Sequence, residues 1–340
     1  MANLFTPLRI KGQEIRNRIV FAPTVTNFGL RNNRAVKFFA ERAKGGVGLI
    51  IVHGTPANLF LDAHWARGLE PLIQAVHGEG AKIVIQLWHG NELNGQPVAP
   101  SARESMRQIS RDEIQTVVEK FATAARNCRE AGFDGVEIHG AHGYFIHQFF
   151  SPLTNQRTDE YGGSAEKRML LAMELIVSMR QAVGERFLLF YRHSAVDGVA
   201  GGTSLDESVR FAKALENHWL DVFDVSAGLG GDQELSIPLA TAPAGTHADL
   251  AGKIKAAVSI PVIAVGRIQT RAVAERILQE EKADLVALSR QLLADPYWPR
   301  KVQEGREGEV VLCTCCNTCA LEMRAGRPIT CPENPKLGKE

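Results

Sequence analysis

The chain has 340 residues, of which 45% are hydrophobic and 23% are charged, and its formal net charge is +1. This balance is typical of a globular protein with a large core, and no run of one charge points to nucleic acid or a membrane surface as a partner. The sequence contains neither a signal-peptide pattern nor an apolar run of about 20 residues, so we expect a cytoplasmic protein without a membrane span.

Short apolar runs alternate with longer amphipathic runs along the whole chain, as expected of parallel strands buried on both faces and connected by helices. The predicted strands are Arg18–Ala22, Val47–Val52, Lys82–Leu87, Gly135–His139, Phe187–Arg192, Val222–Ser226, Pro261–Val265 and Leu285–Leu288. The predicted helices are Ala35–Lys44, Asp112–Ala131, Ala165–Val183, Asp206–Asn217, Ala248–Val258 and Arg271–Glu281. Ser110 and Glu113 form a capping-box pattern at the start of the second helix. Eight strands in this alternation predict an α/β fold in one domain, a (β/α)8 TIM barrel, over an open doubly wound sheet.

Functional residues of a β/α barrel follow the C-terminal ends of its strands, and polar or glycine residues follow all eight strands here. The ends carry Ala22-Pro23-Thr24, His53-Gly54-Thr55, Gln86 with Trp88 and His89, His139 with His142 and Tyr144, Arg192-His193, Ser226 with Gly228, Gly266-Arg267, and Ser289-Arg290. The last two pairs stand where barrels often bind a phosphate. Any of the polar residues taken singly could be a satisfied core residue, but together they favour a cofactor site.

No G-x-G-x-x-G pattern follows a strand and opens a helix, so we expect no dedicated dinucleotide domain. A nicotinamide cofactor would then use the same pocket as the substrate, in alternation with it. The loops Asn91–Val98 and Leu229–Pro238, after strands three and six, are expected to shape that pocket.

Five of the six cysteines crowd into the last 28 residues, while Cys128 stands alone in a helical pattern as an apolar core residue. The five are Cys313, Cys315, Cys316, Cys319 and Cys331. In a chain without a secretion signal, this crowding favours a metal or cluster site over disulfides.

Three stretches resemble the old yellow enzyme family of NADH:flavin oxidoreductases. They are Ala40-Glu-Arg-Ala-Lys-Gly-Gly46, Gln86-Leu-Trp-His-Gly90, and the long segment from Gly135-Val-Glu-Ile-His139 through Gln148-Phe-Phe-Ser-Pro152 to Asn155-Gln-Arg157-Thr-Asp159-Glu-Tyr161-Gly-Gly-Ser164. The resemblance covers the barrel from end to end. It implies an oxidoreductase with non-covalently bound FMN and NAD(P)H as electron donor.

The resemblance also implies roles for individual residues. Ala22, Pro23 and Thr24 would contact the flavin edge, Gln86 would contact its pyrimidine side, and Arg192 would contact the N1/O2 region. Gly266, Arg267 and Arg290 would hold the phosphate. Gly54 and Ser289 would make further contacts with the cofactor. His139 and His142 match the donors to the substrate carbonyl oxygen, and Tyr144 matches the proton donor.

These residue types suit the reduction of a conjugated C=C bond on chemical grounds. Hydride addition at one carbon moves charge to the carbonyl oxygen, where two imidazole N–H groups act as an oxyanion hole, and a tyrosine can protonate the other carbon. A metal pair at His139 and His142, with or without His147, is the alternative, although no carboxylate with ligand spacing accompanies them.

The spacing Cys313-x2-Cys316-x2-Cys319-x11-Cys331 resembles the iron–sulfur branch of the family, which includes 2,4-dienoyl-CoA reductase, 2-enoate reductase and trimethylamine dehydrogenase. The resemblance implies a 4Fe-4S cluster on these four residues, with Cys315 outside the set. Structural zinc is the main alternative. We therefore expect an FMN-binding barrel over residues 1–305 and a cluster-binding segment over 306–340.

Three functions remain open at this point. The first is an ene-reductase that acts on unsaturated carbonyl compounds or enoyl thioesters, and the second is a flavin dehydrogenase subunit that oxidises an amine or a saturated substrate and passes electrons to a partner protein. The third is a metal-dependent barrel lyase or hydrolase with a zinc-stabilised tail. The sequence leaves the specific substrate and a homo-oligomeric state open.

Overall fold

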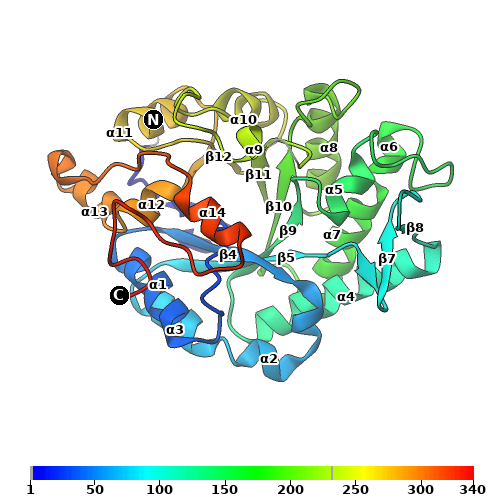
Figure 1. The fold of residues 1–340 in the computed structure, drawn as a ribbon, viewed down its shortest axis with the longest axis horizontal. Coiled ribbons are helices and arrows are strands. Elements are labelled where there is room, and N and C mark those ends of the chain that lie inside the picture. The colour runs from blue at the N-terminus through cyan, green and yellow to red at the C-terminus, as the bar shows by residue number, and fades with distance from the viewer. Residues whose placement is uncertain (1–2, 231–232) are drawn as a thin grey trace.

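The computed structural model describes residues 3–230 and 233–340 and has eight parallel strands that close into a barrel (Figure 1). The strands are β3 (Ile19–Phe21), β4 (Leu49–Pro56), β5 (Lys82–Trp88), β9 (Gly135–Gly140), β10 (Leu188–Ser194), β11 (Val222–Ser226), β12 (Val262–Val265) and β13 (Leu285–Leu288). They pair in chain order, and β13 closes the ring by pairing with β3. All eight predicted strands are present, and the (β/α)8 prediction is confirmed.

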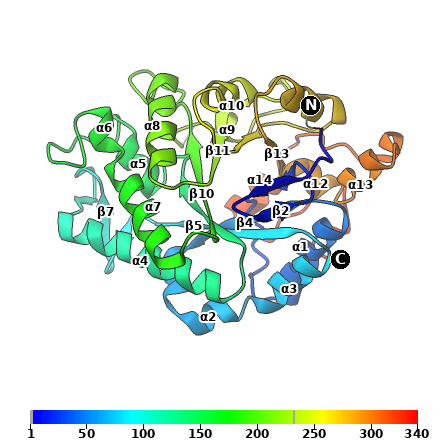
Figure 2. The same cartoon turned by 180° about the vertical axis from the view of Figure 1, so that it is seen from behind.

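Helices cover the outside of the barrel (Figures 1 and 2). They are α1 (Asn33–Lys44), α2 (Ala63–Arg67), α3 (Glu70–Gly78), α4 (Arg111–Glu130), α5 (Phe145–Phe150), α6 (Ala165–Arg168), α7 (Leu170–Val183), α8 (Leu205–Asn217), α9 (Gln233–Ser236), α10 (Ala248–Lys255), α11 (Arg271–Gln279), α12 (Arg290–Ala294), α13 (Trp298–Gln303) and α14 (Thr318–Arg324), with 3-10 turns at Ala57–Leu61 and Glu307–Glu309. The predicted helix Ala165–Val183 is two helices, separated at Met169. The helices that were not predicted have nine residues or fewer, too short for a clear helical period. No helix in the described ranges is long and apolar enough to cross a membrane.

The barrel interior is built in layers. Apolar side chains fill the layer nearer the N-terminal ends of the strands, and polar side chains form the layer nearer the C-terminal ends. Val84, Phe190 and Val222 belong to the interior apolar cluster, which the N-terminal hairpin of β1 (Leu8–Ile10) and β2 (Gln13–Ile15) completes with Ile10 and Ile15. In Figure 2, which views the molecule from behind, this hairpin is the dark blue segment in front of the barrel. Because alternate residues of a strand share a face, the positions two residues further along β5, β10 and β11 point inward as well. Those positions carry polar residues and lie under the open end of the barrel.

Loops beyond the barrel strands are fixed by local hydrogen bonds. The expected capping box starts α4: Glu113 N–H donates to Ser110 Oγ at 3.3 Å, and Ser110 N–H donates to Glu113 Oε2 at 2.9 Å. The excursion after β5 forms a small sheet of β6 (Glu92–Leu93), β7 (Gln96–Ala99) and β8 (Arg107–Gln108).

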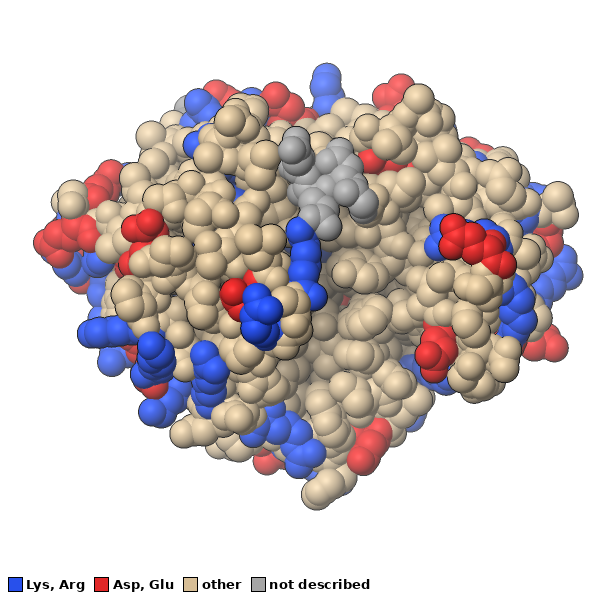
Figure 3. Space-filling view, viewed as in Figure 1, with Lys and Arg blue, Asp and Glu red and all other residues tan. Residues whose placement is uncertain are grey.

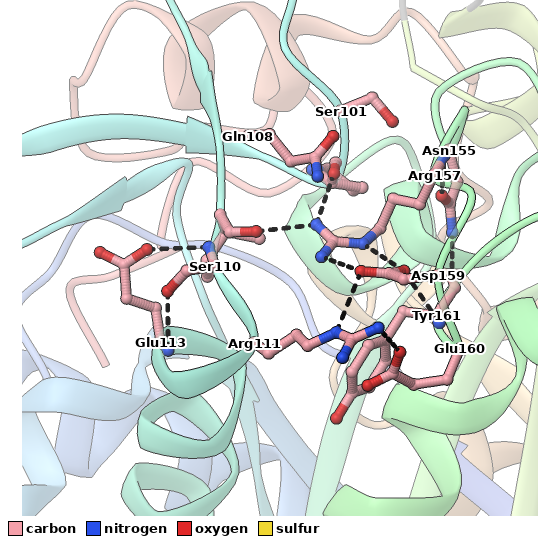
Figure 4. A network of polar contacts seen from close by, with 12 residues as sticks. Ser101, Gln108, Ser110, Arg111, Glu113, Asn155, Arg157, Asp159, Glu160 and Tyr161 are labelled. Atoms are coloured by element: carbon pink, nitrogen blue, oxygen red, sulfur yellow. Dashed lines mark hydrogen bonds and ion pairs between the residues drawn. The ribbon is translucent and has the colours of Figure 1, made fainter.

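The end of the long segment that carries the resemblance, from Asn155 onward, forms a network of polar contacts, shown in Figure 4. The buried Arg157 guanidinium donates to the carbonyls of Pro100 and Ile109, both at 2.8 Å, and to both carboxylate oxygens of Asp159. Asp159 also accepts from the N–H of Tyr161 at 3.1 Å. These contacts tie the segment after α5 to the excursion after β5, away from the barrel mouth.

The last 35 residues lie across one side of the open end, next to α12 (Figure 1). Asn27 Nδ2 donates to two carbonyls of this tail at 3.0 and 2.9 Å, and Gln291 Oε1 accepts from Cys313 N–H at 3.0 Å. A buried ion pair joins Arg42 to Glu340 at 3.4 Å. The tail is therefore docked on the barrel at several separate points.

Candidate active site

The C-terminal ends of the barrel strands open into a cavity of about 650 Å³. Every residue predicted to bind cofactor or to act in catalysis lines it: Ala22, Pro23, Thr24, Gly54, Gln86, His139, His142, Tyr144, Arg192, Gly266, Arg267, Ser289 and Arg290. Four lining residues are arginines, and none of the described lining residues is acidic. Figure 3 shows the surface hollowed near its centre, with Lys or Arg side chains at the border of the hollow. The cavity therefore favours an anionic ligand of small-molecule size.

The ends of β12 and β13 form a basic corner of the cavity. Gly266 has φ +114°, and a Cβ there would lie 3.1 Å from the backbone nitrogen of His247, so only glycine suits this position. The buried Nε of Arg267 has no hydrogen-bond partner among the described residues. Arg290 donates to Asn317 Oδ1 in the tail at 2.6 Å, and Ser289 Oγ lies 2.7 Å from Thr24 Oγ1. Unused guanidinium donors and a close backbone approach are what a phosphate group requires.

On the opposite wall, two cavity side chains, Gln86 and Arg192, are bound by carboxyl groups that lie deeper in the barrel interior. Gln86 Nε2 donates to Glu137 Oε1 at 2.7 Å, and Arg192 forms a buried ion pair with Asp224. A Cβ on Gly54 would lie 3.0 Å from Gln86 Oε1, so the glycine leaves room beside that oxygen. The sequence interpretation missed Glu137 and Asp224. Their one signal is that each stands two residues before a predicted site position, on the inward face of its strand.

His139, His142 and Tyr144 follow β9 and lie close together. The ring of His139 is 5.4 Å from that of His142 and 4.9 Å from that of Tyr144, measured between centroids. The N–H of Ala141 donates to His139 Nδ1 at 3.3 Å, which places the proton of the neutral ring on Nε2. Tyr144 is 44% exposed, so its hydroxyl can exchange protons with solvent.

Both histidines are neutral. Burial, followed by the charge of Arg192, lowers the pKa of His139 to about 3 and lowers the pKa of His142 well below its usual value. His142 Nε2 also lies 2.7 Å from Ser226 Oγ, and this hydroxyl can donate and so leave the ring proton on Nδ1. Each ring can therefore offer one N–H donor without taking up a proton.

A buried network holds the loop that carries these side chains. Gly143 N–H donates to His147 Nδ1 at 2.8 Å, and His147 Nε2 lies 3.1 Å from Asp197 Oδ1, with both side chains fully buried. His147 therefore supports the loop from below and does not line the cavity. No three His, Cys, Asp or Glu side chains in the described ranges are arranged as a metal site, so the structure gives no support to a histidine metal centre here.

The tail brings its cysteines to the cavity in two groups. Cys313 and Cys315 line the wall, and Cys315 N–H donates to Cys313 Sγ at 3.4 Å. Cys319 also lines the cavity and interacts electrostatically with Cys316 and Cys331. Burial raises the pKa of Cys313, Cys319 and Cys331, which favours the neutral thiol form. Thiol donors are present beside the cavity, but no three are gathered around one point.

Of the two loops that were predicted to shape the pocket, one lines the cavity and the other does not. No residue of the segment 91–98 lines the cavity, because this segment folds into β6 and β7 and turns away. The segment 229–238 contributes Gly230, Ser236, Ile237 and Pro238, while residues 231–232 lie outside the described part of the chain. The tail supplies Met323, Arg324 and Ile329, and no pattern in the sequence indicates that these residues lie at the cavity.

Comparison with known proteins agrees with this geometry. Residues 3–309 match the model of the NADH:flavin oxidoreductase / NADH oxidase family. A relative, NADH oxidase of Thermoanaerobacter brockii, is 39% identical over 99% of this chain and 56% of its own. The structure resembles a 2-naphthoyl-CoA reductase complex (TM-score 0.92, 29% identity, 99% of this chain and 57% of that one) and histamine dehydrogenase from Rhizobium sp. 4-9 (TM-score 0.92, 28% identity, 99% and 53%). The chain spans about half the length of these proteins.

Proposed function

Because the chain belongs to the NADH:flavin oxidoreductase family, we propose that it binds FMN in the cavity and reduces the C=C bond of an α,β-unsaturated carbonyl compound or enoyl thioester with electrons from NAD(P)H. One observation carries this proposal. Thirteen residues from the ends of the barrel strands, which are expected to contact the flavin or the substrate carbonyl group, line a single cavity that is rich in arginine.

The residues present fit FMN. The unpartnered Nε of Arg267, the guanidinium of Arg290 and the glycine at position 266 suit the phosphate. Gln86 offers its amide oxygen to the ring edge, and Arg192 offers a positive charge that favours negative charge on the ring. Bound FMN would supply the hydride.

The chain's own residues would then act on the substrate. The N–H groups of His139 and His142 would donate to the carbonyl oxygen, and loss of one such donor costs about 3 kcal/mol of barrier. Tyr144 would give its phenolic proton to the alkene carbon that does not receive hydride, and its exposed hydroxyl would regain a proton from solvent. Hydride and proton together saturate the double bond.

We also propose that Cys313, Cys316, Cys319 and Cys331 bind a 4Fe-4S cluster, with zinc as the alternative. The spacing of these cysteines and the position of the tail beside the cavity support the cluster. Ligation would require loss of the thiol protons.

A second candidate is a flavin dehydrogenase that oxidises an amine and passes electrons through the tail to a partner protein. The similarity to histamine dehydrogenase favours it. The two candidates differ in the reductant of the flavin, which is NAD(P)H in the first and the organic substrate in the second.

Tyr144→Phe tests the first candidate in two anaerobic half-reactions, bleaching of bound flavin by NAD(P)H and its reoxidation by 2-cyclohexenone or an enoyl-CoA ester. We expect reoxidation to slow by about 10²-fold or more, because the proton donor is lost, while bleaching changes little. Tyr297→Phe, at the N-cap position of α13 and outside the cavity lining, is the control. Equal losses in both half-reactions would show that Tyr144 is structural. Bleaching by an amine and not by NAD(P)H would favour the second candidate.

A further inference from the structure

We propose that Glu137 and Asp224 share one buried proton beneath the cavity, and that this pair sets the direction of Gln86 and the charge balance of Arg192. The shared proton involves only the chain's own residues and needs no bound cofactor. Its effect on cofactor binding rests on the proposed function.

Four neighbouring strands bring these side chains together. β5, β9, β10 and β11 are consecutive in the barrel and carry Gln86, Glu137, Arg192 and Asp224, respectively. Both carboxyl groups belong to fully buried residues, and the layer beneath them is the apolar barrel interior. Neither carboxyl can therefore satisfy its oxygens with bulk water.

The hydrogen bonds leave one oxygen of each carboxyl group unaccounted for. Glu137 Oε1 accepts from Gln86 Nε2 at 2.7 Å, and Asp224 Oδ2 accepts from Arg192. Glu137 Oε2 and Asp224 Oδ1 are buried and receive no donor from the described residues. The two carboxyl groups also act on each other electrostatically, since the charge of Asp224 raises the pKa of Glu137. Two buried carboxylates that interact in this way repel each other, and a proton between the two unpartnered oxygens would remove the repulsion and satisfy both, so we assign one group as a carboxylic acid.

The proton belongs to Glu137. Burial, and then the charge of Asp224, raises the pKa of Glu137 well above its usual range. Burial also raises the pKa of Asp224, but the Arg192 guanidinium opposes that rise. The groups that face Glu137 are Gln86 from β5, Arg192 from β10 and Asp224 from β11. The neutral acid thus donates to the Asp224 carboxylate, which balances Arg192.

This arrangement fixes the two cavity residues above it. The Gln86 amide nitrogen is committed downward to Glu137, which leaves Oε1, next to Gly54, as an acceptor for a ligand N–H. Arg192 carries one positive charge against one carboxylate, because Glu137 is neutral. An ionised Glu137 would add a second negative charge below the ligand.

The pH dependence of stability tests the buried proton. In the unfolded chain a glutamate ionises near pH 4.3, so above that pH folding must take up a proton, and stability falls as pH rises toward the folded pKa. Glu137→Gln keeps the hydrogen bonds of the acid form and needs no proton. Between pH 5 and 8 its folding equilibrium constant should therefore gain up to tenfold on wild type with each pH unit.

Two further variants complete the stability test. Asp221→Asn removes a buried carboxylate that pairs with Arg180 and with Lys11 at 3.0 Å, and we expect it to weaken folding without any gain at higher pH. In the Asp224→Asn background Glu137 becomes the counter-charge of Arg192, so adding Glu137→Gln should now destabilise the protein. A loss in Glu137→Gln that is equal at all pH values and in both backgrounds would overturn the shared proton.

FMN titration of the purified variants tests the second half of the proposal. Asp224→Asn combined with Glu137→Gln should bind FMN at least tenfold more weakly than wild type, because no carboxylate remains to balance and aim Arg192. Unchanged FMN affinity in the double variant would overturn the positioning role. If wild type itself bound no FMN, the proposed function would fail, while the stability series would still decide whether the proton is shared.

Discussion

Arg290 links two parts of the molecule through a single guanidinium group. It lines the cavity at the proposed phosphate position and donates to Asn317 Oδ1 in the tail. A guanidinium has five N–H donors in a fixed plane, so it can bind a phosphate and keep the tail contact at once. Asn317 has φ 59°, a left-handed conformation that asparagine tolerates. In this conformation its side chain accepts the hydrogen bond from Arg290. Ligand binding and tail position are therefore expected to influence each other through this residue.

Residues at the strand ends could be predicted from the sequence, whereas their supports could not. Gln86 and Arg192 follow apolar strands, where barrel chemistry is located. Glu137 and Asp224 stand inside apolar strands, and a lone acid there shows neither what it faces nor whether it is ionised. The pairing of β5, β9, β10 and β11 had to be known first, because the facing partners come from three other strands.

At the level of elements, the loop after β9 depends on close backbone contact. Gly143 has φ +74°, and a Cβ there would lie 1.8 Å from the carbonyl oxygen of Leu229. The loop places His142 and Tyr144 on either side of this glycine. Its conformation therefore controls the position of the proposed proton donor.

Gly143→Ala should displace this loop. We expect a loss of about 3 kcal/mol in the free energy of unfolding, from the left-handed backbone together with the clash, and a large fall in turnover. Gly163→Ala is the matched control, because Gly163 has φ +90° and no atom within 4 Å of its added Cβ, so it should lose only about 1–2 kcal/mol. Denaturant unfolding of both variants makes the comparison. Equal losses would show that the contact with Leu229 relaxes freely.

The same scale shows why strands were easier to predict than helices. Each strand is a short apolar run that is buried on both faces and bounded by polar residues, so its position is clear from composition alone. The missed helices α2, α5 and α12 have five or six residues, less than two turns. Met169, where the long predicted helix divides, lies inside a continuous helical pattern, and no glycine or proline marks the break.

For the molecule as a whole, the tail joins the cavity wall. Cys313, Cys315 and Cys319 lie at the same cavity as the strand ends, although they are far from most of them in sequence. The crowding of cysteines in this segment is visible in the sequence, and the cluster that we expect there stays a prediction. Its docking depends on hydrogen bonds from side chains such as Asn27 and Gln291 to tail backbone, and such contacts leave no pattern in a single sequence.

Metal analysis of protein prepared without oxygen tests the tail. We expect about four iron and four sulfide per chain, lost in Cys331→Ser and retained in Cys315→Ser, because only the former belongs to the proposed ligand set. Cys128→Ala, in the buried face of α4, is the control and should keep the metal. Zinc without sulfide would contradict the cluster, and loss of metal in Cys315→Ser would contradict the choice of ligands.

FMN titration of the wild type and Arg290→Ala tests whether FMN binds at the barrel mouth with its phosphate at β12 and β13. We expect one FMN per chain in wild type and an affinity weaker by about 10–100-fold in Arg290→Ala, since a hydrogen bond to a charged group contributes about 1.5–3 kcal/mol. Asn317→Gly removes the tail contact but keeps the guanidinium, and its affinity should stay closer to wild type. A wild type that binds no FMN would contradict the cofactor site. An Arg290→Ala variant that binds FMN as tightly as wild type would contradict the position of the phosphate.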